Sequence, residues 1–175
     1  MNAGVILKDS TEEKTQLVFL SGETECCRAS TNDEIIELIK EREPEVVAVD
    51  AGTQVGRDEF NEQEEELKEE GYSFTPTSHE TKKARRLEAL KARLFEEMGA
   101  KQPEIIRFEP RITAEELALH DESALGSLGV DASGLESSEQ FDAMLGAVTA
   151  RFYEQNQVRD LGVVIPEPLG EQESK

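Results

Sequence analysis

Three carboxylates in this sequence stand where they could do chemistry together. Asp50 and Glu109 each end a predicted strand, and Asp142 lies in a late predicted helix on a flank of small residues that includes Gly146 and Thr149. If the two strands are parallel neighbours, their terminal carboxylates project from the same edge of a sheet. Open α/β folds place their sites at that edge. The spacing therefore predicts that strand ends and a helix flank converge on one acidic site.

Clustered carboxylates repel one another and raise each other's pKa values. A divalent cation removes this conflict, and Mg²⁺ prefers oxygen ligands. Two such ions about 4 Å apart can activate a water molecule and stabilise the leaving oxygen of a phosphodiester. The two histidines of the chain, His79 and His120, are isolated and form no competing ligand set. We therefore predict a Mg²⁺ or Mn²⁺ site whose ligands and catalytic residues are Asp50, Glu109 and Asp142.

Each of these carboxylates also has a plainer interpretation. An aspartate that ends a strand is often a turn former, and a glutamate before Pro110 is equally ordinary. Asp142 is harder to explain in this way, because an acid among Phe, Ala, Met and Leu needs a partner or a task. Both the structural and the functional interpretation stay open for Asp50 and Glu109.

A second candidate feature is a group of six basic residues on the predicted helix Thr81–Met98. In a chain of net charge −20, it is the one plausible phosphate-facing patch in the sequence. We predict that it contacts a nucleic-acid backbone through Lys82, Lys83, Arg85 and Arg86. The other interpretation, also open, is a solvated helix face whose charges pair with nearby glutamates such as Glu88.

The excess of acidic residues indicates the kind of solution in which the protein works and carries little information about its fold. The 175 residues contain 39 acidic and 19 basic side chains. Such an excess keeps a protein soluble by self-repulsion, and it suits a cytosol of high salt, where screening limits that repulsion to a few ångströms. We predict a halophilic, archaeal source. Binding of nucleic acid over the whole surface is disfavoured, so any such site must be local.

Several classes of protein are disfavoured by missing motifs. The sequence has no glycine-rich phosphate loop of the GxGxxG or GxxxxGK type, which counts against nucleotide-binding proteins and kinases. The two cysteines, Cys26 and Cys27, are adjacent, so we expect reduced thiols and neither a disulfide nor a zinc site. The sequence shows no signal-peptide pattern and no apolar run of membrane-spanning length. We therefore expect a cytoplasmic protein without membrane contact.

The elements that must position these residues alternate between strands and helices. The predicted hairpin comprises Gly4–Leu7 and Gln16–Leu20, and a helix follows the capping box formed by Thr31 and Glu34. The order then continues with the strand Val46–Val49, a solvated helix or partly disordered lid over 58–70 and a helix over 81–98. After these come a strand over 104–109, a short helix over 113–119, a glycine-bearing loop over 125–134, a helix from Ser137 to about Glu154 and a last strand over 162–165. This order predicts an α/β fold with a mixed sheet flanked by helices. We assign residues 1–168 to a single domain and residues 169–175 to a charged, disordered tail.

The segments VAVDAG, Arg57-Asp58, FEPR, SSEQFDAMLGAVTARFY and VVIPEP resemble the predicted nucleases of ribonuclease H-like fold that are grouped as domain-of-unknown-function family 429. The resemblance runs from about Gly4 to Pro168 and is most specific around Asp142. It implies a ribonuclease H-like mixed sheet and metal-dependent cleavage of nucleic acid. It also implies acidic site positions at Asp50, Glu109 and Asp142, and Arg57 matches a recurrent arginine that we assign to substrate binding.

One departure from this family affects the expected activity. Ribonuclease H-like enzymes begin with a strand that carries an aspartate at its centre, whereas this hairpin begins with NAGVIL, which resembles the family's second strand. We therefore expect the first strand and its aspartate to be missing, either because the true start lies upstream of Met1 or because the protein has lost a metal ligand. Asp9 in the turn is a poor substitute. Two functions stay open: a metal-dependent nuclease, or a non-catalytic binding or assembly module that has lost a metal ligand. The sequence carries no signal for an oligomeric state.

Overall fold

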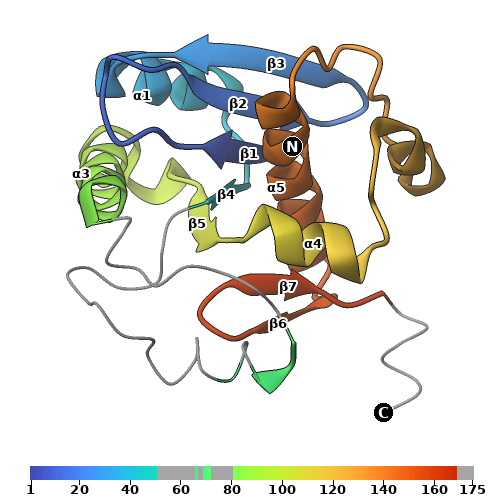
Figure 1. Cartoon of the computed structure of the whole chain (residues 1–175). Coiled ribbons are helices and arrows are strands. Elements are labelled where there is room, and N and C mark those ends of the chain that lie inside the picture. The colour runs from blue at the N-terminus through green and yellow to red at the C-terminus, as the bar shows by residue number, and fades with distance from the viewer. Residues whose placement is uncertain (51–65, 67–68, 72–80, 169–175) are drawn as a thin grey trace.

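The computed structural model describes residues 1–50, 66, 69–71 and 81–168. Five strands form one mixed sheet in the order β3-β2-β1-β4-β5 (Figure 1). The antiparallel strands are β1 (Asn2–Ile6), β2 (Thr15–Leu20) and β3 (Thr24–Ala29), and β4 (Val46–Val49) and β5 (Glu104–Arg107) extend the sheet parallel to β1. The predicted hairpin is confirmed, and the condition set for the candidate site is met, since the two later strands are parallel neighbours.

Helices cover both faces of this sheet (Figure 1). Helix α5 (Ser138–Glu154) packs on β1, β2 and β4 across one face, and α1 (Asn32–Arg42) and α3 (Thr81–Met98) lie on the other. The remaining elements are α4 (Pro110–Glu116), which packs on α5, the 3₁₀ helices η2 (Gly99–Lys101) and η3 (Glu122–Leu128), and a small antiparallel sheet of β6 (Val158–Asp160) and β7 (Val164–Pro166). No helix in the described ranges is both long and apolar enough to cross a membrane.

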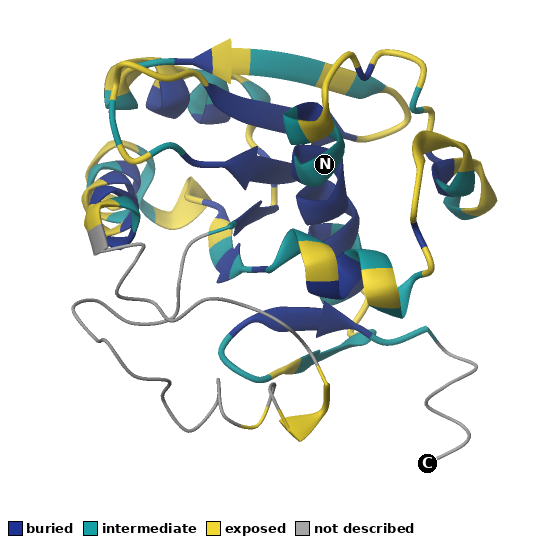
Figure 2. Ribbon diagram, viewed as in Figure 1, coloured by how far each residue is buried: buried dark blue, intermediate teal, exposed yellow. Residues whose placement is uncertain are grey.

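The sequence of β4 is apolar at every position because both faces of this strand are buried. Val46 and Ala48 belong to the core under α5, while Val47 and Val49 belong to the core under α1 and α3. A central strand that is covered on both faces needs apolar side chains at every position. Figure 2 shows the same burial along β1, β2 and most of α5.

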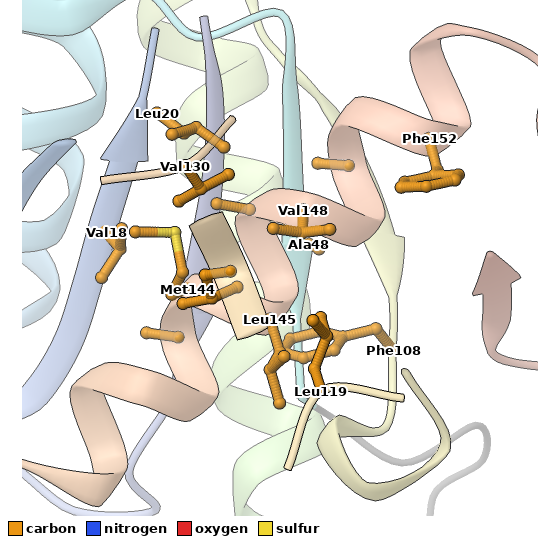
Figure 3. Close-up of a cluster of buried hydrophobic side chains, with 14 of the residues drawn as sticks. Val18, Leu20, Ala48, Phe108, Leu119, Val130, Met144, Leu145, Val148 and Phe152 are labelled. Carbon is orange, nitrogen blue, oxygen red and sulfur yellow. The ribbon is translucent and has the colours of Figure 1, made fainter. Parts of the chain in front are cut away.

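The core under α5 joins that helix to the centre of the sheet. Figure 3 shows Met144, Leu145 and Val148 of α5 together with Ala48 of β4 and Phe108, which follows β5. Met144 and Phe108 are both at most 1% exposed. Each fully buried side chain of this size contributes about 1.5–3 kcal/mol relative to its exposed state, so this helix–sheet contact is a main source of stability.

Two glycines allow α5 to lie unusually close to β1. A Cβ atom on Gly4 would lie 1.8 Å from the carbonyl oxygen of Ala143, and one on Gly146 would lie 2.6 Å from Cζ of Phe108. The small-residue flank predicted beside Asp142 is therefore the surface through which the helix contacts the sheet. The position of Asp142, one turn before Gly146, follows from this contact.

The predicted helix starts are confirmed by their capping bonds. Thr31 Oγ1 accepts a hydrogen bond from the Glu34 N–H (3.1 Å), and Glu34 Oε2 accepts one from the Ser30 N–H (2.9 Å). The helix ends at Glu43, which has a left-handed backbone (φ 47°) directly before Pro44. Ser137 Oγ caps α5 by accepting from the N–H of Gln140 (3.2 Å).

The strand that we expected to be missing is present. Strand β1 occupies the centre of the sheet, antiparallel to β2 and parallel to β4. That expectation was wrong because a hairpin pattern alone does not reveal a parallel partner that comes later in the chain. What the strand lacks is a carboxylate, since Asn2–Ile6 reads NAGVI.

Other segments also differ from their predictions. Edge strand β3 went unpredicted because its exposed positions carry Glu25 and Arg28. Its adjacent cysteines pack against opposite cores and are both free, and burial raises the pKa of Cys27 to about 11.

Helix α4 begins at Pro110, earlier than predicted, because proline is favoured at a first helical position. The predicted helix over 58–70 lies mostly outside the described residues, as does His79.

Candidate functional site

Asp50 completes the hydrogen bonding between β4 and β1. Its backbone N–H donates to the carbonyl oxygen of Val5 (3.2 Å), and its Oδ1 accepts from the N–H of Leu7 (2.8 Å). In a regular parallel ladder, the Leu7 N–H would donate to the backbone carbonyl of Asp50. The side chain takes that place, so the carboxylate ends β4 while satisfying the N–H group just beyond β1.

The second oxygen of Asp50 is held by a lysine. Oδ2 accepts from Nζ of Lys83 at 2.6 Å, and the side chains of Asp50 and Lys83 are only 12% and 14% exposed. Burial raises the pKa of Asp50 above its ordinary value, while the Lys83 ammonium and the Leu7 N–H act in the opposite direction. The pair joins α3 to the end of β4. Lys83, which we predicted to contact substrate, is engaged inside the protein.

Asp142 lies within electrostatic reach of Asp50. Burial raises the pKa of the half-buried Asp142, the negative charges of Asp50 and Glu139 raise it further, and Arg111 lowers it. The structure therefore brings two of the three predicted carboxylates together.

Glu109 has a different environment. It is the N-cap of α4, and its carboxylate accepts from the N–H of Arg111 (3.4 Å). It follows Phe108, whose N–H extends the β4–β5 ladder by donating to Val49 (3.1 Å). Glu109 thus lies at the predicted edge of the sheet, where it has a structural role in starting a helix.

Lys8 is a member of this edge that we did not predict. It follows β1, its Nζ lies 2.5 Å from Oε1 of Glu139 in the first turn of α5, and Glu13 lies 4.0 Å away. The hydrogen bond to Glu139 raises the pKa of Lys8, and the charges of Glu139, Glu13 and Asp50 add to that effect. The sequence shows that Lys8 directly follows a predicted strand. It does not show that this strand pairs with β4, and only that pairing brings Lys8 close to Asp50.

These residues do not fit a metal centre as they stand. Both oxygens of Asp50 are occupied, and a lysine takes the position of a cation at one of them. Among the residues that the structure describes, no three His, Cys, Asp or Glu side chains are grouped so that they could hold a metal ion. The ligand roles of Asp50, Glu109 and Asp142 therefore stay a prediction.

The predicted basic patch on α3 divides into three environments. Lys82 and Arg85 are exposed. Lys91 and Arg93 pair with acidic neighbours, in agreement with the solvated-face interpretation. Arg86, by contrast, is 9% exposed and points into the protein. Arg57, the other predicted substrate contact, lies outside the described residues.

The guanidinium of Arg86 connects α3 to two loops. It donates to Oδ1 of Asn32 (2.7 Å) and to three backbone carbonyl oxygens, those of Lys8 (2.8 Å), Ser10 (3.3 Å) and Ser30 (2.7 Å). Burial lowers the pKa of Arg86, and Asp9 partly offsets this. With its donors used in this way, Arg86 fixes the β1–β2 turn and the start of α1, which is a structural role.

The similarity of this chain to known proteins lies in its fold. No protein-family model and no curated protein matches the chain. Among solved structures, RuvC of Thermus thermophilus in complex with a Holliday junction substrate is 20% identical over 94% of this chain and 97% of its own, with a TM-score of 0.52. A second Thermus thermophilus RuvC structure is 16% identical over 94% and 98%, with a TM-score of 0.50. The fold is ribonuclease H-like. At these identities the likeness concerns the fold alone, a five-stranded mixed sheet flanked by helices in one domain.

Proposed function

We propose that this chain is a non-catalytic protein of ribonuclease H-like fold that serves as a binding module. The observation that carries this proposal is the state of Asp50. Its two oxygens are taken by the Leu7 N–H and the Lys83 ammonium, and the pair is largely buried. A carboxylate in this state is a structural group and not an open ligand.

Entry of a metal ion at this edge would carry a high energetic cost. A cation that binds Oδ2 of Asp50 would compete with the Lys83 ammonium for that oxygen, and a displaced Lys83 would lose its partner at a largely buried position. The adjacent strand β1 offers no carboxylate as compensation, and Lys8 adds a further positive charge nearby. Electrostatics at this edge therefore oppose a divalent ion.

A nucleic acid is the partner class that we propose. One of the similar structures, RuvC, was solved with a Holliday junction. In this chain, Lys82 and Arg85 supply exposed positive charge on α3, near the end where Lys83 contacts the β4 edge. Because the overall charge is −20, binding must be local, and its phosphate contacts should make it weaken as the salt concentration rises.

The second candidate is the metal-dependent nuclease predicted from the sequence. The observation in its favour is the proximity of Asp142 to Asp50 and Glu139, because mutually repelling carboxylates are what a Mg²⁺ or Mn²⁺ ion relieves. In that case Asp50, Glu109 and Asp142 would hold the metal, which would supply an activated water for phosphodiester hydrolysis.

Cleavage assays on the full chain decide between the two. Labelled four-way junctions, duplex DNA, single-stranded DNA and RNA are incubated with the protein in Mg²⁺ or Mn²⁺, beside Asp50→Ala and Asp142→Ala proteins purified identically. We expect no cleavage above the level of these variants, together with salt-sensitive binding that is weakened in a Lys82→Ala/Arg85→Ala variant. Metal-dependent cleavage that both aspartate substitutions abolish would overturn the proposal in favour of the nuclease.

A further inference from the structure

We infer that the ammonium groups of Lys8 and Lys83 supply, from within the chain, the positive charge that divalent cations supply at a carboxylate edge of this kind. The inference rests on the proposed function, because it explains how a ribonuclease H-like edge without metal can stay folded. It assigns a shared charge-balancing role to two lysines that approach the edge from different elements.

The two lysines approach the same edge from different directions. Lys8 comes from the end of β1 and contacts Glu139 of α5 at 2.5 Å, and Lys83 comes from α3 and contacts Asp50 after β4 at 2.6 Å. Together these pairs join four elements, β1, β4, α3 and α5, at the end of the sheet. A metal ion held by strand-end and helix carboxylates would join the sheet and α5 in a similar way.

Among the residues that the structure describes, basic groups oppose the carboxylates near Asp142. Asp50 and Glu139 both act on Asp142, and the basic groups that act on these three carboxylates are Lys83, Lys8 and Arg111. Glu13 also acts on Lys8, but it is 64% exposed and 4.0 Å away, so water screens it. These basic groups therefore offset part of the repulsion around Asp142.

These two ion pairs differ from the other lysine pairs in the described part of the chain. The side chains of Lys8 and Lys83 are 21% and 14% exposed, whereas those of Lys40 and Lys91, which also pair with glutamates, are 36% and 41% exposed. Charge interactions strengthen as water is excluded. The Lys83–Asp50 pair, which is largely buried on both sides, therefore contributes more than surface pairs, whose contribution is typically small. Glu139 is 43% exposed, so water screens the Lys8 pair more strongly.

Removing Lys83 without removing its carboxylate tests this role. In Lys83→Met the apolar stem is kept and the charge is lost, so Asp50 and Asp142 repel each other with less opposing charge. We expect the melting temperature in EDTA to fall by about 10 °C, while Lys91→Met, which removes an exposed lysine of the same helix, changes it little. Millimolar Mn²⁺ should recover part of the loss in Lys83→Met and leave the wild type unchanged.

Two further variants ensure that the test does not depend on whether Lys83→Met folds. Lys8→Met should show a smaller loss with the same Mn²⁺ response, and Asp50→Asn/Lys83→Met should show no Mn²⁺ response, because both charges of the pair are gone. Mn²⁺ binding is read directly by electron paramagnetic resonance. If Lys83→Met and Lys8→Met lose no more stability than Lys91→Met, or if Mn²⁺ recovers neither, the inference fails while the proposed function stands. Tight Mn²⁺ binding with cleavage by the wild-type protein would overturn both.

Discussion

The backbone N–H of Leu7 donates to Oδ1 of Asp50 across the end of the β1–β4 pair, at 2.8 Å. A side chain therefore completes a ladder that the backbone of β4 does not continue. The same carboxylate binds Lys83 through its other oxygen. Asp50 thus connects two strands and a helix, and its first measurable role is in stability.

Replacing Asp50 should destabilise the protein by an amount that depends on which contacts the new residue keeps. Asp50→Ala removes the acceptor of Leu7 and leaves Lys83 buried without its partner, so we expect a loss of about 3–5 kcal/mol in the free energy of unfolding. Asp50→Asn keeps an acceptor oxygen and should lose less. Urea denaturation measures both, with exposed Glu96→Gln as a control expected within about 0.5 kcal/mol of wild type. An Asp50→Ala protein as stable as this control would contradict the structural role.

The raised pKa of Asp142 predicts a stability that depends on pH. Between the unfolded and folded pKa values the native state binds more protons, so stability falls as pH rises through that window. Because the folded pKa lies above the ordinary value of 3.8, the penalty is absent below that pH and develops as the pH rises through the folded pKa. Asp142→Asn should therefore be more stable than wild type at pH 7, with the difference vanishing near pH 3.

Chemical denaturation at several pH values, in EDTA and again in Mg²⁺, checks the Asp142 prediction. Glu115→Gln, an exposed acid on α4, is the matched control. If Asp142→Asn were less stable than wild type specifically in Mg²⁺, the residue would be acting as a metal ligand, as the nuclease hypothesis requires.

The contact between Gly4 and α5 should not tolerate a methyl group. Gly4→Ala would place Cβ against backbone atoms of Ala143 and Ala147, which cannot move aside alone, so we expect a loss of about 3 kcal/mol or more. Gly146→Ala meets the ring of Phe108 and gains helix propensity, so its loss should be smaller. Thermal unfolding gives this order, and Gly134→Ala, which has open space around it, is the control.

Arg85 and Arg86 should behave as opposites although they are neighbours. Arg86→Met leaves three partly buried carbonyl oxygens without this donor, so we expect a loss of about 1–3 kcal/mol or more. Arg85→Met should leave stability unchanged and weaken the binding of nucleic acid, since its side chain is exposed. Urea denaturation and fluorescence anisotropy with a labelled junction separate the two effects. Equal effects of both substitutions on binding, with no change in stability, would refute this division.

Much of the fold could be predicted from the sequence because its signals are local. The caps of α1 and α5 and the apolar run of β4 depend on residues a few positions apart, and all were identified. Edge strand β3 was not, because an exposed strand with charged side chains has no apolar alternation to detect.

The partners at the candidate site could not be predicted in this way. That β1 lies parallel to β4 depends on a pairing between residues more than 40 positions apart. The positions of Lys83 and Arg86 depend on how α3 docks on the sheet, and the sequence shows only that both are basic. Asp50 does follow the last residue of β4, as predicted, but its partners are known only from the three-dimensional arrangement.

The contact between Gly4 and Gly146 also controls the electrostatics of the edge. Asp142 lies one helical turn before Gly146, so the depth at which α5 rests on β1 sets the separation of Asp142 from Asp50. Two residues without side chains thereby determine how strongly two charged residues interact. A small outward shift of α5, caused by added volume at Gly146, would lower the pKa of Asp142 although no ionisable group had been changed.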